Sequence, residues 1–414
     1  MPEAADDGHE VTAGTWQAGL GTVLREWGRI GVTGFGGPPA HIALLRRLCV
    51  ESRGWLDAAE FEDAIAACNL LPGPASTELA ILCAWRVRGR AGAVAGGLAF
   101  IVPGLIIILF LAALFLAGAP PLWVRGAGAG AGAAVAAVAA ATGWSLVPPS
   151  WKRASAREPA RLSRARWVCY LLAGGGASAT IGPWLVLVLL GCGLVELGWR
   201  RWSGRLPAVP VIAPLFLKPL FLKPLFLKPL FPAVLSGGIL ASVAWVAFKV
   251  GALSFGGGFV IIPLMHADAV GRGWMTNDQF LNAVALGQIT PGPVVQTVAA
   301  VGYAAAGLPG GLLAAVVAFS PSFAFVLGGG RYFSALRENR AAQSFLDGAG
   351  PAAIGAIFGA AVLLARVLSV DWQFAVLAGA AVLLLALRRG VVLTLLSAAA
   401  VGLVVAFAGG PLPR

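Results

Sequence analysis

The chain has 414 residues, of which 58% are hydrophobic and only 12% are charged. Soluble domains carry about 25% charged residues, so the composition excludes a soluble enzyme, and disorder would need far fewer apolar residues. The formal net charge of +12 lies mostly in short loops between apolar runs, where it orients membrane helices, so we expect no nucleic-acid partner. A spanning helix needs about 20 residues; we therefore predict an all-α polytopic protein of the lipid bilayer, with about 10 to 12 membrane segments.

The first half of the chain is expected over residues 16–205, after a polar tail at residues 1–15. It opens with two apolar regions broken by Gly and Pro, 20–45 and 60–85. The Gly- and Ala-rich stretch 126–142 predicts a tightly packed interior helix, because small residues let membrane helices approach closely. Long apolar runs follow the broken regions, at 91–117, 124–147 and 167–198, the last of which we interpret as a helical hairpin broken near Gly182-Pro183.

A linker at residues 206–231 is predicted to separate the first half from the second, 232–414. It repeats Pro-Leu-Phe-Leu-Lys three times, and a Pro every five residues forbids a continuous helix. We interpret it as a low-complexity connection at the membrane interface, with its lysines reaching the headgroups. The second half again opens with apolar sequence that Gly and Pro break, at 245–266 and 279–304, within or beside long apolar runs at 232–255, 309–330, 345–365, 372–387 and 391–408.

The two halves are related by an internal repeat. The stretch Arg29–Gly37 (RIGVTGFGG) matches Lys249–Gly257 (KVGALSFGG), 220 positions later. Further on, Leu71-Pro-Gly-Pro74 matches Thr290-Pro-Gly-Pro293, and the offset has drifted only to 218 where Pro103 matches Pro321. A match held over this length predicts two structurally equivalent halves.

Loop charge gives the expected orientation of the halves. Residues 86–90 (RVRGR) precede the 91–117 run and are strongly basic, whereas their counterpart, 304–309, is uncharged. After the run the pattern reverses, because 117–125 is nearly neutral and its counterpart, 331–340, is basic. Positive loops stay in the cytoplasm, so we predict repeats of inverted topology. Whether the Pro-Gly-Pro segments span the membrane or re-enter it stays open.

Two backbone breaks in each half form the candidate substrate site. Paired Gly/Pro interruptions in matching places of inverted halves point to a transporter site. A helix that starts after such a break offers free N–H groups and its positive dipole end to an anion, and glycines allow close approach of a tetrahedral oxyanion. The alternative is that these residues only kink packed helices. The backbone candidates are Phe35, Gly36, Gly37, Pro38, Pro72, Gly73, Pro74, Gly256, Gly257, Pro291, Gly292 and Pro293.

Side chains near the breaks complete the candidate site. Arg29 and Lys249 occupy the same repeat position beside apolar sequence, where a cation is functional or else snorkels to the interface. Hydroxyl, amide and imidazole groups near the breaks suit an oxyanion, although Ser and Thr there also suit helix capping. These polar candidates are His41, Asn69, Ser76, Thr77, Gln288 and Thr290.

Glu78 is the candidate for proton coupling. It is one of few carboxylates within apolar sequence, and it stands in the first turn after the Pro72-Gly73-Pro74 break. In sequence its repeat partner is Thr297, which cannot titrate. A titratable intramembrane residue indicates a proton carrier, while a carboxylate at this place also fits a structural role at the helix start.

We expect neither catalysis nor a cofactor. The sequence contains no HExxH pair, no Ser-His-Asp pattern and no paired catalytic carboxylates, and the spacing of its five cysteines gives no metal site. It also contains no GxxxxGK[ST] phosphate loop, so we expect transport to be secondary unless a separate subunit hydrolyses ATP.

The motifs resemble those of the chromate ion transporter (CHR) family, in its long two-domain form. The resemblance lies in Gly34–Ile42 (GFGGPPAHI), in Asn69–Leu79 (NLLPGPASTEL) and, in the second half, in Phe255–Gly258 and Gly287–Pro293 (GQITPGP). It implies a bacterial-type inner-membrane protein that exports chromate, driven by membrane potential or a proton gradient, and so confers chromate resistance. The sequence departs from the expected pattern at Ala75, where we expect Asn, and in the linker repeat.

Other functions remain open from sequence. Sulfate is the expected mimic of chromate, so a sulfate or other oxyanion carrier is one alternative, and an anion channel is another. A titratable residue such as Glu78 favours a carrier over a channel. The sequence leaves the transport direction, the coupling ion and the oligomeric state open, and a homodimer is one assembly to test.

Overall fold

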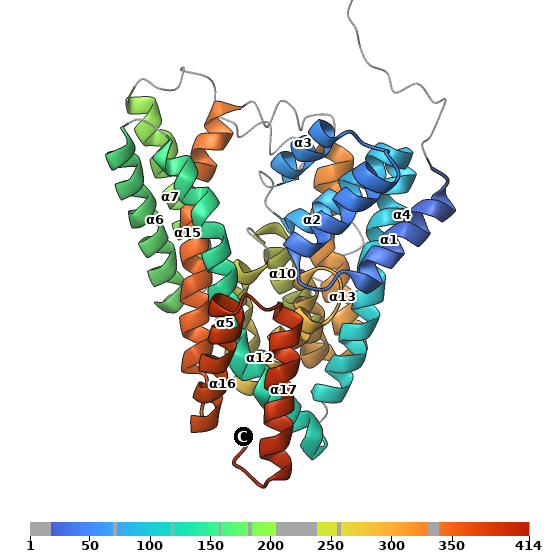
Figure 1. Ribbon diagram of the computed structural model, residues 1–414, viewed down its shortest axis with the longest axis vertical. Coiled ribbons are helices and arrows are strands. Elements are labelled where there is room, and N and C mark those ends of the chain that lie inside the picture. The colour runs from blue at the N-terminus through green and yellow to red at the C-terminus, as the bar shows by residue number, and fades with distance from the viewer. Residues whose placement is uncertain are drawn as a thin grey trace, which may run out of the picture.

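The computed structural model describes residues 18–68, 73–116, 120–156, 159–180, 184–203, 238–254, 258–329 and 339–413. The polar tail 1–15 and the linker 206–231 lie outside the described residues. Within the described part, every regular element is a helix (Figure 1), and the protein is an all-α polytopic membrane protein.

The first half is built from α1 to α7. In chain order its elements are α1 (Leu20–Thr33), α2 (Pro38–Arg46), the π-helical segment η1 (Arg47–Ser52), α3 (Ala58–Cys68), α4 (Ala75–Phe115), α5 (Leu122–Ser155), α6 (Ala160–Thr180) and α7 (Leu185–Trp202). As predicted, the 167–198 run forms two helices, α6 and α7, on either side of the predicted break, whose residues 181–183 lie outside the described part.

The second half follows the same order. Its elements are α10 (Ile239–Ala252), the 3-10 turn η3 (Phe259–Ile261), α11 (Ile262–Gly271), α12 (Asn277–Ile289), the 3-10 turn η4 (Val294–Gln296), α13 (Thr297–Gly329), α15 (Arg340–Arg366), α16 (Asp371–Ala381), the π-helical segment η6 (Val382–Ala386) and α17 (Val391–Phe407). Four stretches of the described chain are long and apolar enough to cross a membrane, namely 75–115, 122–155, 294–329 and 340–366.

Two of these long helices contain a sharp reversal of the chain. In α4 the backbone leaves helical geometry at Arg88 (φ −144°, ψ 21°) and Gly89 (φ 64°, ψ −156°). In α13 the same happens at Ala306 (φ −147°, ψ 28°) and Gly307 (φ 63°, ψ −155°). The two pairs lie 218 positions apart and agree within a few degrees, so the internal repeat read from the sequence is present in the backbone.

Each reversal folds its helix into a hairpin. A Cβ built on Gly96 would touch the Cβ of Ala84, although twelve residues of straight helix would hold them about 18 Å apart. In α13, Gly302 faces Gly310 and Ala314 in the same way. The first arm of α4, 75–87, is only about 20 Å long at 1.5 Å per residue, too short to cross a hydrocarbon core of about 30 Å.

Glycine and alanine set the packing between helices. As predicted, the small-residue stretch of α5 is an interior helix, buried almost throughout from Gly126 to Ala139. Gly130 lies against the backbone of Ala398 in α17, and Gly174 of α6 lies against the backbone of Ala352 in α15. Without a Cβ at these places the helices approach closely, which drives association in a bilayer.

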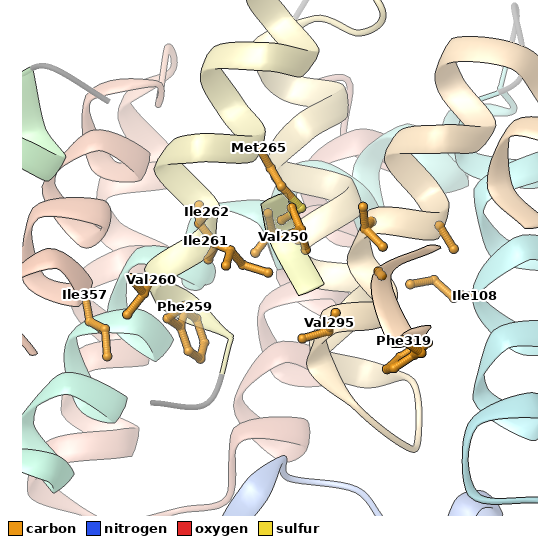
Figure 2. Packing of buried hydrophobic residues seen from close by; sticks show 14 of the residues in the cluster. Ile108, Val250, Phe259, Val260, Ile261, Ile262, Met265, Val295, Phe319 and Ile357 are labelled. Atoms are coloured by element: carbon orange, nitrogen blue, oxygen red, sulfur yellow. The ribbon is translucent and has the colours of Figure 1, made fainter. Parts of the chain in front are cut away.

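The core joins the two halves around the second half's broken segments. Figure 2 shows Phe259, Val260 and Ile261 of η3 in an apolar layer that extends through Val295 to Ile108 of α4. All of these side chains are at most 3% exposed. The broken segments are therefore enclosed by packed apolar residues of both halves, as irregular backbone at membrane depth requires.

Candidate functional site

The first break of the first half is a glycine turn between α1 and α2. The Gly34 N–H donates to Ile30 O at 2.7 Å and ends α1. Gly36 and Gly37 then take φ values of 101° and 72°, a region that residues with a Cβ rarely adopt. Pro38 stands at the first position of α2, where its missing N–H costs nothing.

This turn is hydrogen-bonded to the second break of the other half. The carbonyl oxygen of Gly34 accepts from the Gly292 N–H at 3.0 Å and lies 2.9 Å from Nε2 of His41. Gly292 itself has a φ of 92°, between Pro291 and Pro293. Breaks that are 258 residues apart in sequence are thus one structural unit.

His41 links the same turn to the second break of its own half. It is fully buried, and its Nδ1 lies 3.3 Å from Ser76 Oγ at the start of α4. When Nε2–H donates to Gly34 O, Nδ1 is left to accept the Ser76 hydroxyl proton. An edge-on contact with the Phe100 ring, 5.0 Å between centroids, fixes the ring plane.

Val294 is the point where three breaks meet. It follows the Pro291-Gly292-Pro293 break directly. A Cβ built on Gly37 would lie 3.6 Å from one Val294 methyl, and a Cβ on Gly258 would lie 3.3 Å from the other. The glycines of both first breaks therefore lie against the second break of the second half.

The fourth break, at Gly73-Pro74, lies against the long arm of α13. A Cβ on Gly73 would overlap Oε1 of Glu78 and would lie 3.6 Å from Oγ of Ser322. The Thr77 and Glu78 N–H groups both donate to the Pro74 carbonyl, at 2.8 and 3.1 Å. Glu78 is therefore turned back toward the break and toward the other half.

Polar atoms without a hydrogen-bond partner concentrate at these breaks. A buried polar group left unpaired is costly, and native structures hold few. In the described part of the chain the unpaired buried atoms at or beside the breaks are Thr77 Oγ1, both carboxyl oxygens of Glu78, Ser254 Oγ, Gln288 Nε2, Gln296 Oε1 and Ser322 Oγ. The hydroxyls of Thr77, Ser254 and Ser322 and the Nε2 amide of Gln288 are donors suited to an oxyanion, whereas the Gln296 Oε1 oxygen is an acceptor.

The two predicted cations lie apart from this buried set. Arg29 is on an exposed position of α1. Lys249 pairs with Asp268 at 2.5 Å, and Asp268 also lies 3.4 Å from Arg272. The role of Arg29 and Lys249 as anion ligands stays a prediction, and Lys249 reaches an anion only by leaving Asp268.

The remaining predicted residues divide into three groups. Ser76, Thr77, Gln288 and Thr290 are buried at the breaks, and Thr290 donates its hydroxyl to Leu286 O at 2.9 Å, as a helix-end residue does. Phe35 is 44% exposed and is not part of the buried set. Four predicted residues, Asn69, Pro72, Gly256 and Gly257, lie outside the described residues.

Sequence reasoning missed Ser254 and Ser322. Ser254 is the repeat counterpart of Gly34, and Ser322 follows Pro321 and is the counterpart of Gly104. Each is a polar residue where the other half has glycine. That asymmetry, rather than the motif itself, is the signal in the sequence that marks them.

A second polar cluster lies where the ends of α5, α6, α7 and α15 meet, at the upper left of Figure 1. Glu196 of α7 accepts from Arg166 at 2.8 Å, from Arg200 at 2.7 Å and from the Tyr170 hydroxyl at 3.1 Å. Arg200 also pairs with Asp347 of α15 at 3.0 Å. Because its carboxylates face these arginines, we interpret this cluster as a tie between helices.

Comparison with known proteins decides the family. The family model described as "Chromate transporter" matches residues 21–197 and 241–403, which cover both halves and leave out the linker. The chain belongs to the chromate transporter family. The resemblance read from the motifs is thereby confirmed. Family membership and the long apolar helices together show that the protein is a membrane transporter.

Named relatives match over most of their length. The chain is 31% identical to the chromate transport protein of Cupriavidus metallidurans, over 93% of this chain and 92% of that protein. It is also 31% identical to the chromate transport protein of Pseudomonas aeruginosa, over 82% of this chain and 79% of that one. No solved structure matches the fold significantly.

Proposed function

We propose that this transporter is a secondary active carrier in the cell membrane that exports a tetrahedral oxyanion, with chromate as the substrate. The observation that carries the proposal is that three breaks meet at Val294 and His41 links the fourth to them, with unpaired buried hydroxyl and amide groups beside the breaks. The names of the relatives support chromate as the anion. Because an inside-negative membrane potential expels a dianion, it supplies a driving force for export.

The proposed site binds the anion with neutral groups. Helix N-termini at α2 and α4 add N–H groups and positive dipole ends to the hydroxyl donors of Thr77, Ser254 and Ser322. Neutral donors in fixed positions replace the water shell of an anion without holding it so tightly that it cannot leave. Sulfate has the same shape and charge as chromate, so competition between the two is expected.

Flux in inside-out vesicles tests this proposal. We expect uptake of chromate under an inside-positive potential, inhibited by sulfate more than by phosphate, whose protonation state differs. A separate imposition of a pH gradient at zero potential tests proton coupling. Uptake equal to that of vesicles without the protein would contradict the proposed function, and flux that dissipates any gradient without coupling would indicate a channel.

A further inference from the structure

The clearest unassigned feature of the buried site is the pair formed by Glu78 and Ser322. Both side chains are fully buried, and neither carboxyl oxygen nor the hydroxyl has a hydrogen-bond partner. Both side chains lie against Gly73. Glu78 belongs to α4, the helix that follows Gly73, and Ser322 belongs to α13 of the opposite half. A carboxyl group and a hydroxyl thus share one side of a break in the proposed anion site.

The second half shows the same arrangement with a side chain that cannot titrate. Gln296 Nε2 lies 3.3 Å from the place of a Cβ on Gly292, the counterpart of Gly73. It lies 3.1 Å from the place of a Cβ on Gly104, the counterpart of Ser322. In space Gln296, rather than the sequence partner Thr297, therefore has the neighbours that match those of Glu78.

Gln296 shows what a donor does at this position. Its amide donates to the Ile101 carbonyl on the long arm of α4 at 2.7 Å and so ties one half to the other. A carboxyl group can donate only when it is protonated. Glu78 can therefore donate a hydrogen bond, as Gln296 does, only when its carboxyl group is protonated.

The surroundings of Glu78 offer no compensating cation within the described residues. Among titratable groups, the Cys68 thiol of α3 interacts with the Glu78 charge, and the ring of His41 of α2 reaches Ser76, two residues before Glu78. α13 contributes the neutral Ser322, and α1 contacts this arm of α4 through Trp27 Nε1, which donates to Ala80 O. The charged residues of α12 and α5, Asp278 and Arg125 among them, make no hydrogen bond to Glu78.

We propose that an oxyanion and a proton bind to this site together, with Glu78 holding the proton and Ser322 donating its hydroxyl to the anion. An ionised, unpaired carboxylate beside a dianion would repel it through a medium that screens poorly. Each ligand therefore increases the affinity of the other, as linkage requires. The inference rests on the proposed function, because it assumes that the breaks bind the anion.

Anion binding as a function of pH tests the linkage. The full-length protein in detergent would be titrated with labelled sulfate between pH 6.5 and 9.5, where sulfate stays a dianion, and with chromate above pH 7.5. For one linked proton the dissociation constant rises up to tenfold per pH unit once Glu78 ionises. We expect this rise in the parent protein and a flat profile, with tight binding at high pH, for Glu78→Gln.

Matched variants separate the proton carrier from the anion donor. Ser322→Ala should weaken binding severalfold at every pH and keep the slope. Glu51→Gln, at a carboxyl that is 59% exposed, should behave as the parent protein in both respects. A parent protein that binds sulfate or chromate equally at all pH values, or a Glu78→Gln variant that keeps the slope, would overturn the linkage while the proposed function stands.

A second measurement does not depend on any variant. In weakly buffered solution at pH 8.5, saturating the parent protein with sulfate should withdraw up to one proton per chain from the medium. Binding without proton uptake would overturn the inference. Failure of the parent protein to bind either anion at any pH would instead contradict the proposed function.

Discussion

At the scale of single residues, the site depends on glycines whose missing Cβ leaves room for a neighbour. Gly36, Gly37 and Gly292 are required by backbone conformation, since their φ values are positive. Gly73 is required for space, because Glu78 occupies the place where its Cβ would be. A substitution at a glycine with positive φ strains the backbone, whereas a substitution at Gly73 displaces the Glu78 side chain. The substitution at Gly73 therefore tests the mechanism more directly.

Gly73→Ala tests the need for space at the fourth break. The added methyl group would displace the Glu78 carboxyl, so we expect chromate flux to fall at least tenfold while the protein still inserts and stays helical. The matched control is Gly176→Ala, at a helical glycine of α6 with nothing within 4 Å of its Cβ position. Flux in the Gly73→Ala variant equal to that of the control would show that Glu78 has no fixed place in transport.

At the scale of elements, the ion-pair cluster of Glu196 holds three helices together. Glu196 of α7 is 3% exposed and pairs with Arg166 of α6 and with Arg200, which reaches Asp347 of α15. Removing one member of a buried ion pair leaves the others uncompensated, at a cost of about 3–5 kcal/mol. The cluster lies on elements other than those that form the breaks, so its loss should act on stability.

Glu196→Ala tests that separation of roles. We expect the free energy of unfolding in detergent to fall by about 3 kcal/mol, followed through tryptophan fluorescence, with sulfate affinity unchanged in the folded protein. Glu51→Ala is the control, because the exposed pair with Arg46 is worth at most about 1 kcal/mol. A loss of anion affinity with unchanged stability would move the cluster into the binding machinery.

The sequence predicted the repeat and its breaks better than the shape of the helices. Repeated motifs such as Phe35-Gly-Gly37 and Pro72-Gly-Pro74 mark places where the backbone must turn. The structure has a turn at each of these motifs that it describes. The loops predicted at 86–90 and 304–309 contain the reversals at Gly89 and Gly307, but hydropathy does not show that each loop is a tight two-residue turn. The sequence also does not predict that the breaks of the two halves lie together, since the hydrogen bond from Gly292 to Gly34 joins residues 258 positions apart.

At the scale of the whole molecule, the two halves share one backbone plan and differ in charge. The reversal at Arg88-Gly89 lies within the basic stretch 86–90, whereas the reversal at Ala306-Gly307 lies in uncharged sequence. Basic residues stay on the cytoplasmic side. We therefore expect the equivalent hairpin turns on opposite sides of the membrane, the arrangement in which inverted repeats expose one site to each side in turn.

Arg90 and Leu308 form a matched pair for testing this topology. They lie 218 positions apart, each just after its reversal, and both are exposed, Leu308 to 54%. Arg90→Cys and Leu308→Cys would be placed singly in a background whose five cysteines are replaced by Ala or Ser. On intact cells a membrane-impermeant maleimide should label the Leu308→Cys variant and spare the Arg90→Cys variant, and inside-out vesicles should reverse the result. Labelling of both from the same side would show that the repeats are parallel, and alternating access by exchange of equivalent halves would then lose its structural basis.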